Sequence, residues 1–228
     1  MTAVNQDARI RSFRQRGGRM GPELRAALAS GWPDYGLTAA GEPWDLATVF
    51  PSADGAVLEV GSGMGDATVA SAEAEPNLGI IAVEVHVKGV AATLRAARAR
   101  GLTNIRVVIA DAVDVLQHEI EPSSLAAIRV WFPDPWPKKR HNKRRLVNAD
   151  FVHLACSRLR QGGLLHVATD VAGYASAIES VLATEPGLRA DVVGGPRPAS
   201  RPETRYEAVG IAAGREVWDF CYRRDGTG

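Results

Sequence analysis

The chain has 228 residues, a length that favours a single domain with at most a short extension. Hydrophobic residues make up 46% of it and charged residues 23%, which excludes a wholly disordered chain, a collagen-like fibre and a disulfide scaffold. Lysine and arginine together number 27 against 26 aspartate and glutamate residues, so the net charge of +1 indicates no partner. Any preference for a partner has to come from how the charges are distributed.

The first 25 residues form a basic arm. Six arginines, at positions 9, 11, 14, 16, 19 and 25, stand there against Asp7 and Glu23. Glycines at positions 17, 18 and 21 are expected to break any long helix, so we predict an arm that is mobile or docks late. No apolar run approaches the roughly 18 residues that span a membrane, and no hydrophobic signal segment is found near the N-terminus. A cytoplasmic location is therefore expected.

Strand and helix patterns alternate at short spacing from residue 56 onward. Strands are predicted at 56–61, 78–85, 105–111, 125–132, 164–170, 188–193 and 216–224. Helices are predicted at 67–75, 88–100, 113–119, 146–159 and 174–184, the fourth closed by two glycines at 162 and 163. This order predicts βαβ units, and hence a mostly parallel sheet of seven strands with helices on both faces. The last two strands lack a helix-length spacer, so the final strand is expected to pair antiparallel.

Ligands of open α/β sheets bind beyond the carboxyl ends of the strands. The first strand leads from Glu59 into a turn with Gly61, Gly63 and Gly65. Glycines permit positive φ and a close approach of a ligand, although a merely tight turn is the alternative. A dinucleotide fingerprint needs Gly or Ala where this chain has Asp66, whose carboxylate would repel a pyrophosphate. The pattern ExGxGxG resembles instead motif I of class I S-adenosylmethionine-dependent methyltransferases.

Carboxylates also close the next two strands. Glu84 can accept hydrogen bonds from both ribose hydroxyls of an adenosine ligand, and Asp111 can accept one from an adenine amino group. The alternatives are that Glu84 faces solvent and that Asp111 only caps the following helix. Together with Glu59, these residues fit a ligand with a ribose, a ring amine and a cationic head group. S-adenosylmethionine has all three.

A proline-rich loop and a basic run follow the fourth strand. Prolines 133, 135 and 137 leave Asp134 little conformational freedom, which suggests a rigid carboxylate that orients a substrate beside the cofactor. Six of the eight residues from Lys138 to Arg145 are lysine or arginine. Such a run is often only a solvated surface, but beside a catalytic site it attracts phosphates.

The remaining polar segments leave several options open. Asp170 closes the fifth strand, and Glu207 ends a mixed-charge segment; either could accept hydrogen bonds from a guanine, or the segment is a polar surface loop. Cys156 and Cys221 have no CxxC partner and the histidines at 86, 118, 141, 153 and 166 lack metal-ligand spacing, so no metal is expected. The turn around Ser62 is not GxSxG, which argues against a hydrolase.

Three segments of the chain resemble a known family. Residues 132–146 resemble the signature of bacterial single-subunit tRNA (guanine-N7-)-methyltransferases, and 201–207 with 217–220 resemble its C-terminal signature. Residues 11–13 and 18–20 resemble the arm that precedes the domain, so the similarity runs from about residue 11 to 222. One departure is Ser62, where the family often has an aromatic residue.

The resemblance implies a Rossmann-like class I methyltransferase domain over 51–228, after a basic arm and lead-in over 1–50. The implied activity is methyl transfer from S-adenosylmethionine to N7 of a guanine in tRNA, typically at position 46 of the variable loop. Guanine N7 needs no deprotonation and the sulfonium methyl is already activated, so catalysis would rest on positioning and electrostatics. The implied partner is tRNA, with no membrane and no metal, for a monomer or homodimer.

The resemblance also assigns individual residues. Asp134 would be the catalytic residue, holding the guanine or the cofactor amine. The cofactor would be bound by Glu59, Gly61, Gly63, Gly65, Glu84, Asp111 and Asp134. The substrate guanine and its surroundings would be bound by Lys138, Asp170, Thr204, Arg205, Tyr206 and Glu207. The tRNA would contact Arg140, His141, Asn142, Lys143, Arg144 and Arg145.

Three other functions compete with this one. A methyltransferase for a small molecule or a protein would use the same glycine-rich turn, but would leave the basic run without a purpose. A non-catalytic RNA-binding module with a decayed cofactor site is disfavoured because all four cofactor carboxylates are present. An NAD-dependent oxidoreductase is disfavoured by Asp66.

Overall fold

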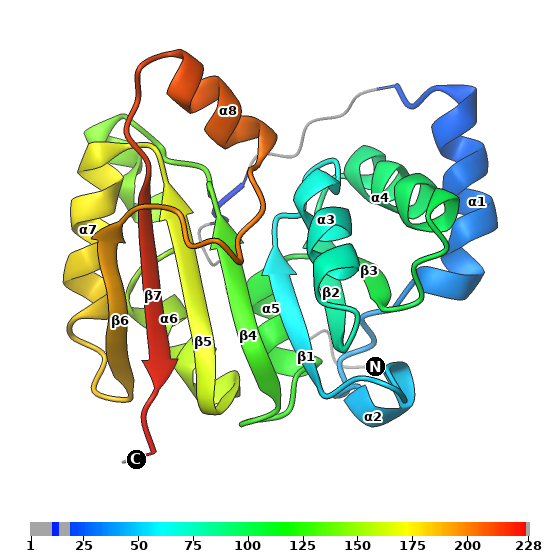
Figure 1. The fold of residues 1–228 in the computed structure, drawn as a ribbon, viewed down its shortest axis with the longest axis horizontal. Coiled ribbons are helices and arrows are strands. Elements are labelled where there is room, and N and C mark those ends of the chain that lie inside the picture. The colour runs from blue at the N-terminus through cyan, green and yellow to red at the C-terminus, as the bar shows by residue number, and fades with distance from the viewer. Residues whose placement is uncertain (1–10, 14–18, 227–228) are drawn as a thin grey trace, which may run out of the picture.

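A computed structural model describes residues 11–13 and 19–226 of the chain. Seven strands form one sheet in the order β3-β2-β1-β4-β5-β7-β6, in which β7 runs antiparallel to both of its neighbours (Figure 1). Their bounds are β1 Gly55–Val60, β2 Leu78–Glu84, β3 Ile105–Ile109, β4 Leu125–Trp131, β5 Leu159–Thr169, β6 Leu188–Gly195 and β7 Trp218–Arg224. The prediction of a mostly parallel sheet with an antiparallel final strand is confirmed.

Helices cover both faces of the sheet. In the described ranges they are α1 Pro22–Tyr35, α2 Leu46–Val49, α3 Asp66–Ala74, α4 Val87–Ala99, α5 Ala112–His118, α6 Ala149–Arg158, α7 Ala172–Leu182, α8 Arg205–Ala212 and the 3₁₀ helix η1 Lys139–Arg144. Helices α3 and α4 lie in front of β1, β2 and β3 in Figure 1, with α1 packed outside α4, whereas α5, α6 and α7 lie behind the sheet. None of these helices is long and apolar enough to cross a membrane.

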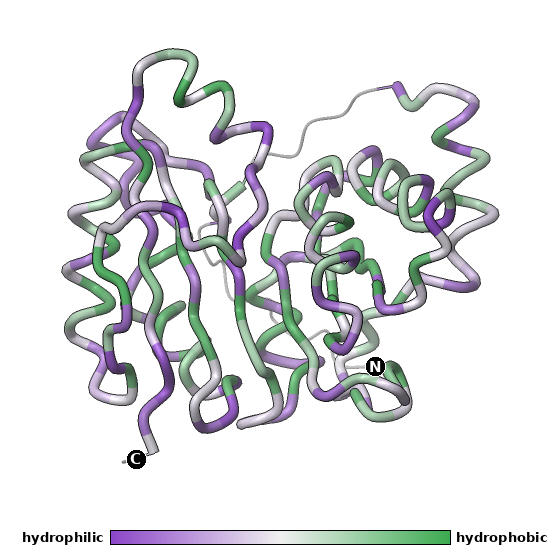
Figure 2. Tube along the Cα trace, in the orientation of Figure 1, coloured by the Kyte–Doolittle hydropathy of each residue, from purple (hydrophilic) through white to green (hydrophobic). Residues whose placement is uncertain are grey.

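The core consists of two hydrophobic clusters, one on each face. Leu58, Ile128 and Val167 belong to the larger cluster, together with side chains of α5, α6 and α7. Ile80 belongs to the smaller cluster, together with Leu94 of α4 and residues of α1 and α3. Strand residues alternate between the two faces, and Figure 2 shows the hydrophobic stretches that run along the strands. Burial of these apolar surfaces is what stabilises the layered arrangement.

The helix predicted at 146–159 is shorter than expected. The basic run forms η1, and α6 begins only after Asn148, whose side chain accepts a hydrogen bond from the backbone N–H of Phe151. The glycines at 162 and 163 do not close this helix, because β5 already begins at Leu159. They lie at an irregularity where the pairing of β5 with β4 shifts register, and Gly162 has a φ of 72°.

The α-helices α1, α2 and α8 were not predicted. Helix α1 begins at Pro22, directly after one of the glycines expected to break helices, in the first turn where proline is favoured. The arginines at 9, 14 and 16 and the glycines at 17 and 18 lie outside the described residues. Helix α8 forms where a polar loop was the alternative, and its N-terminus has a capping box between Thr204 and Glu207.

The predicted boundary between a lead-in over 1–50 and a domain over 51–228 stays a prediction. Tyr35 of α1, within the lead-in, packs in the core.

The sheet topology creates one edge at which a ligand can bind. Strand β1 pairs with β2 on one side and β4 on the other, so the chain leaves β1 and β4 in opposite directions and opens a crevice at their carboxyl ends. This edge is the upper one in Figure 1, where α8 and the N-termini of α3 and α4 lie. The carboxylates of Glu59, Glu84, Asp111, Asp134 and Asp170 end or follow strands at this edge, and Glu207 lies on α8 above it.

Candidate active site

The glycine-rich turn after β1 adopts the conformation that its composition predicts. Gly61, Gly63 and Gly65 have φ values of 73°, 58° and 84°. A Cβ atom added at Gly61 or Gly63 would meet no heavy atom within 4 Å, whereas one at Gly65 would lie 2.2 Å from the Oγ1 atom of Thr93 on α4. Gly65 is therefore required for α3 to pack against α4, and the other two glycines leave open space beside the backbone.

Glu84 and Asp111 both bind backbone groups. The Oε2 atom of Glu84 accepts a hydrogen bond from the N–H of Gly63 at 2.9 Å, and its Oε1 atom accepts one from the N–H of His86 at 2.8 Å. The Oδ1 atom of Asp111 accepts one from the N–H of Val113 at 3.0 Å and caps α5. Each carboxylate oxygen has a second lone pair, so both residues are held in place and can still accept a further hydrogen bond.

Glu59 is buried and incompletely satisfied. Its Oε2 atom and the hydroxyl of Ser62 have no hydrogen-bond partner among the described residues. Burial raises the pKa of Glu59 to about 7, although the nearby Thr68 hydroxyl and Arg129 favour the ionised form. Buried polar atoms are nearly always hydrogen-bonded in a folded protein. These two atoms therefore fit a ligand that brings a polar or cationic group to the glycine-rich turn.

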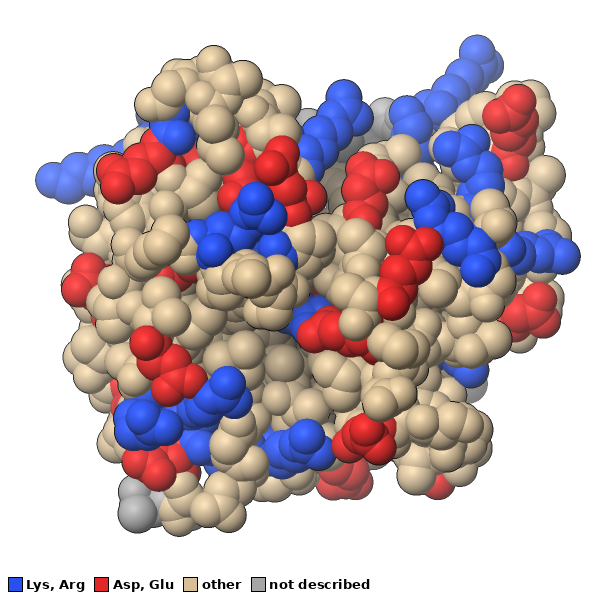
Figure 3. Space-filling model, in the orientation of Figure 1, with Lys and Arg blue, Asp and Glu red and all other residues tan. Residues whose placement is uncertain are grey.

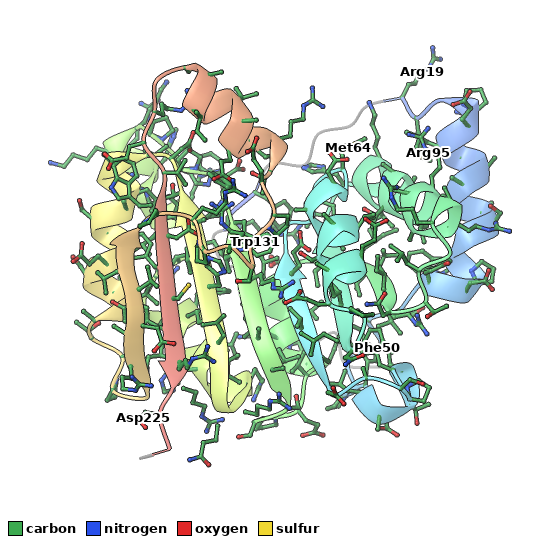
Figure 4. All side chains as sticks on the ribbon, in the orientation of Figure 1. Arg19, Phe50, Met64, Arg95, Trp131 and Asp225 are labelled. Atoms are coloured by element: carbon green, nitrogen blue, oxygen red, sulfur yellow. The ribbon has the colours of Figure 1, made fainter. Side chains whose placement is uncertain are left out.

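Asp134 lies in a strained loop. It is exposed, and no hydrogen bond to it is recorded within the described residues. Two residues before and two after it, Phe132 and Trp136 have φ values of 55° and 44°, in the left-handed region that bulky residues rarely adopt. Such a conformation persists only where surrounding contacts hold it. The backbone that carries Asp134 is therefore held in place beyond the carboxyl end of β4, where Figure 4 labels Trp131, with Met64 labelled above α3.

Contacts from distant parts of the chain hold this loop. The indole N–H of Trp136 donates to the backbone oxygen of Ser12 at 2.8 Å, which ties a described part of the arm to the loop. The guanidinium of Arg145 donates to the backbone oxygens of Pro135 at 3.0 Å and Gly173 at 3.1 Å. The predicted basic run thus includes a residue that fixes the loop from its far end.

The basic run divides into an exposed and a packed part. The guanidinium of Arg144 lies 4.9 Å from the ring of Trp136, and the ring of His141 meets the same indole edge-on at 5.8 Å. In Figure 3, basic side chains lie along the upper edge from the right of α8 to the α1–α4 pair, with acidic side chains among them. The exposed members of the run are Lys138, Lys139, Arg140, Asn142 and Lys143.

Some of the residues predicted to bind guanine are exposed and others are buried. Tyr206 on α8 is 69% exposed, and Arg205 is exposed beside it. Asp170 lies under α8, where its Oδ2 atom accepts a hydrogen bond from Arg215 at 2.7 Å. Thr204 and Glu207 are buried and bond to each other's backbone in the capping box. The structure therefore brings Asp170 to α8, but it buries two of the predicted contacts.

Sequence reasoning assigned no role to the most extensive polar network in this region. Arg201 is 1% exposed and bonds to both Glu207 and Asp219, and Asp219 also bonds to His166 at 2.7 Å. Burial alone would raise the pKa of Asp219, but the bonds from His166 and Arg201 hold it below its usual value. Both Arg201 and Asp219 lie in the predicted C-terminal signature, yet no local pattern indicates that they pair.

Comparison with known proteins decides the family. Residues 54–220 match the family described as "Putative methyltransferase". A tRNA (guanine-N(7)-)-methyltransferase from Nitrosospira multiformis is 47% identical over 94% of each chain. One from Streptomyces avermitilis is 45% identical over 96% of this chain and 76% of its own. The chain belongs to the tRNA (guanine-N(7)-)-methyltransferase family. The predicted resemblance is confirmed.

Solved structures confirm the fold. The 16S rRNA methyltransferase KamB has a TM-score of 0.55 at 18% identity and covers 81% of this chain and 95% of its own. The antibiotic-resistance methyltransferase Kmr has a TM-score of 0.54 at 19% identity, covering 81% and 93%. At such identities the likeness concerns the fold alone. The chain thus has the Rossmann-like class I methyltransferase fold.

Family and fold together imply the use of S-adenosylmethionine. The residues at the carboxyl edge of β1 and β2 fit this cofactor on their own account. The glycine-rich turn offers open space, and the buried Oε2 atom of Glu59 needs a donor. Among the described residues, no cluster of histidine, cysteine and carboxylate side chains could hold a metal ion, and both cysteines are free and buried.

Proposed function

We propose that this chain transfers a methyl group from S-adenosylmethionine to N7 of a guanine in tRNA. The observation that carries the proposal is the loop from Phe132 to Pro137. This loop places the exposed carboxylate of Asp134 at the carboxyl edge of β4 and leads directly into a basic 3₁₀ helix. The names of the close relatives support the same substrate and the same atom.

The cofactor would be held by the residues at the ends of β1, β2 and β3. When bound, it supplies an electrophilic methyl group on a sulfonium centre. Glu59 would accept from its cationic amine, while Glu84 and Asp111 would use their remaining lone pairs for the ribose hydroxyls and the adenine amine. Gly61, Gly63 and Gly65 give the backbone room for this approach.

Asp134 would orient the reactants. Guanine N7 has a lone pair in the plane of the ring, so the attack needs no general base. An exposed carboxylate on a backbone that is held in place can accept hydrogen bonds from the guanine or from the cofactor amine. No metal is needed, because the methyl group is already activated.

The substrate side would be formed by two exposed surfaces that flank this loop. Lys138 on one side, with Arg205, Tyr206 and Asp170 on the other, would surround the guanine. Thr204 and Glu207 would act there through the capping box that fixes the start of α8. The surrounding RNA would contact the run Arg140, His141, Asn142, Lys143 and Arg144, whereas Arg145 would act by fixing the loop of Asp134.

The proposal includes the arrangement expected from the sequence. Residues 1–50 form a basic lead-in and 51–228 the catalytic domain. The enzyme acts in the cytoplasm on tRNA, as a monomer or a homodimer.

The test is methyl transfer from labelled S-adenosylmethionine to unmodified tRNA, followed by digestion to nucleosides. We expect the label in 7-methylguanosine, located in the variable loop, and its loss in the Asp134→Ala variant. Label in another nucleoside would contradict the assigned atom. Cofactor binding without any labelled tRNA would retain the cofactor site and exclude this substrate in favour of a small molecule or a protein.

A further inference from the structure

We infer that Arg201 is a positioning residue that joins the substrate-side helix α8 to the loop carrying Asp134. In this role it sets where the guanine lies relative to the methyl donor. The inference rests on the proposed function, and it concerns a residue that touches neither of the proposed ligands.

The hydrogen bonds of Arg201 reach two carboxylates at once. Its Nε and Nη2 atoms donate to the two carboxylate oxygens of Asp219 at 2.7 and 2.9 Å. Its Nη1 and Nη2 atoms donate to those of Glu207 at 2.6 and 3.0 Å, and Nη1 also reaches the backbone oxygen of Pro202. Arginine is the side chain whose planar fork allows two bidentate contacts, so the position of one carboxylate fixes that of the other.

Each carboxylate belongs to a different part of the site. Glu207 closes the capping box of α8, and it is also reached by Arg197 at 3.2 Å. Asp219 lies on β7 and bonds across to His166 on β5, whose ring packs edge-on against Trp131. The segment between β6 and α8 crosses in front of β7 and β5 in Figure 1, and Arg201 attaches it to the sheet.

The guanidinium of Arg201 also contacts the loop of Asp134. It lies 5.4 Å from the centre of the Phe132 ring. Phe132 is one of the two residues with a left-handed backbone that flank Asp134. One buried side chain thus contacts α8, β7 and the loop, and a change in its length or shape would shift the two sides of the substrate site relative to each other.

Burial of the ion pairs of Arg201 fixes the geometry of the site but adds little to the stability of the fold. Arg201 and Asp219 are 1% and 0% exposed. A buried ion pair gains little stability over apolar residues of the same volume, because desolvation offsets the attraction. Its advantage is a fixed arrangement, which matters when reacting groups must be placed within a fraction of an ångström.

Arg201→Lys tests the inference, with Arg223→Lys as the matched control. The lysine keeps the charge but cannot contact both carboxylates bidentately. Arg223 lies on β7, the strand that carries Asp219; it binds Asp191 at 2.5 Å and is 46% exposed, outside the proposed site. We expect kcat for tRNA methylation to fall at least tenfold in Arg201→Lys, while the Kd for S-adenosylmethionine stays within about twofold of the parent value. Arg223→Lys should leave both quantities within about twofold.

Asp219→Asn is the second variant, because it keeps the volume of the side chain while removing its charge. We expect the same separation of kcat from cofactor affinity, with unfolding midpoints measured for all variants. A folded Arg201→Lys or Asp219→Asn protein with parental kcat would overturn the inference. Loss of kcat and of cofactor affinity in the same proportion would also overturn it. Failure of both variants to fold would do the same, because each result shows that Arg201 contributes to general stability. Absence of 7-methylguanosine with the parent protein would instead contradict the proposed function.

Discussion

The two halves of the carboxyl edge are constructed in different ways. On the cofactor half, Glu84 and Asp111 are held by hydrogen bonds from backbone N–H groups in the turns around β1, β2 and β3. On the substrate half, side chains join segments that are far apart in the chain, such as Trp136 to Ser12, 124 residues away, and Arg215 to Asp170, 45 residues away. A short sequence motif can therefore indicate the cofactor half. The substrate half depends on contacts between distant segments, which no short motif indicates.

The two halves also differ in whether a carboxylate is available to bind a ligand. At the end of β2, Glu84 accepts hydrogen bonds from the backbone N–H groups of Gly63 and His86 in the neighbouring turns, and its remaining lone pairs can accept more. A carboxylate in the substrate half meets arginines from other segments, as Glu207 meets Arg201 and Arg197. Carboxylates of the cofactor half can thus bind a ligand, whereas Glu207 in the substrate half forms ion pairs that stabilise the fold.

The largest effect is expected at Asp134, the exposed carboxylate between the halves. Asp134→Ala should lower kcat by roughly 10²- to 10³-fold, the usual cost of losing one oriented group at a reacting centre. Asp134→Asn should retain part of that activity, because its amide can still accept a hydrogen bond. Single-turnover kinetics on unmodified tRNA would measure both. An asparagine variant as inactive as the alanine variant would exclude hydrogen bonding as the role of Asp134.

The cofactor half should be sensitive to backbone changes. Gly65→Ala places a Cβ atom 2.2 Å from Thr93 Oγ1 at a φ of 84°, so we expect a loss of about 2–4 kcal/mol in the free energy of unfolding. Gly101→Ala is the matched control, since Gly101 has a φ of 63° but open space around its Cα atom. It should cost only about 1 kcal/mol. Equal losses in denaturant titrations of the two variants would contradict the packing role of Gly65.

The same division explains how much could be predicted from the sequence. The seven strands, their mixed directions and the glycine-rich turn depend on local periodicity and on a few turn residues, and these predictions are confirmed. Helix α8 could have been predicted from the Thr-x-x-Glu spacing of Thr204 and Glu207, which is typical of a capping box. The start of α6 was placed three residues too early because Leu146 and Val147 extend the apolar pattern of the helix, whereas Asn148 is its N-cap.

The network around Arg201 could not be predicted in this way. Its partners Glu207 and Asp219 lie 6 and 18 residues away, in a helix and in a strand, so no periodicity relates them. Burial of the guanidinium depends on how the segment before α8 crosses the sheet. The roles assigned to individual residues from the family resemblance stay predictions, and the burial of Glu207 shows why each needs its own test.

The two parts of the basic run should respond differently to substitution. Lys138, Lys139 and Arg140 are exposed, so replacing all three with glutamine should weaken tRNA binding and reduce the slope of log Kd against log salt by about 2–3. Arg145→Gln should mainly lower the unfolding midpoint, because its guanidinium bonds to Pro135 and Gly173. The binding assay is a salt titration of each variant. Similar changes of slope in both variants would show that Arg145 contacts RNA directly.

Burial of Glu59 should give the cofactor side a pH dependence. The pKa of Glu59 is raised from 4.5 to about 7 by burial, so the folded protein holds this proton more tightly than the unfolded chain. Between about pH 4.5 and 7, stability therefore falls as the pH rises, and Glu59→Gln should remove this slope. Above about pH 7 both states are ionised and the slope should disappear.

Cofactor binding should show the opposite trend, since the proposed contact with a cationic amine requires ionised Glu59. Affinity for S-adenosylmethionine should weaken by up to about tenfold for each pH unit below 7 in the parent protein, but not in Glu59→Gln. Calorimetric titrations at about pH 6, 7 and 8, with thermal unfolding at each pH, would measure both trends. If the parent and the variant share one pH profile, Glu59 does not hold the cofactor amine, and the buried Oε2 atom has to be satisfied by another donor.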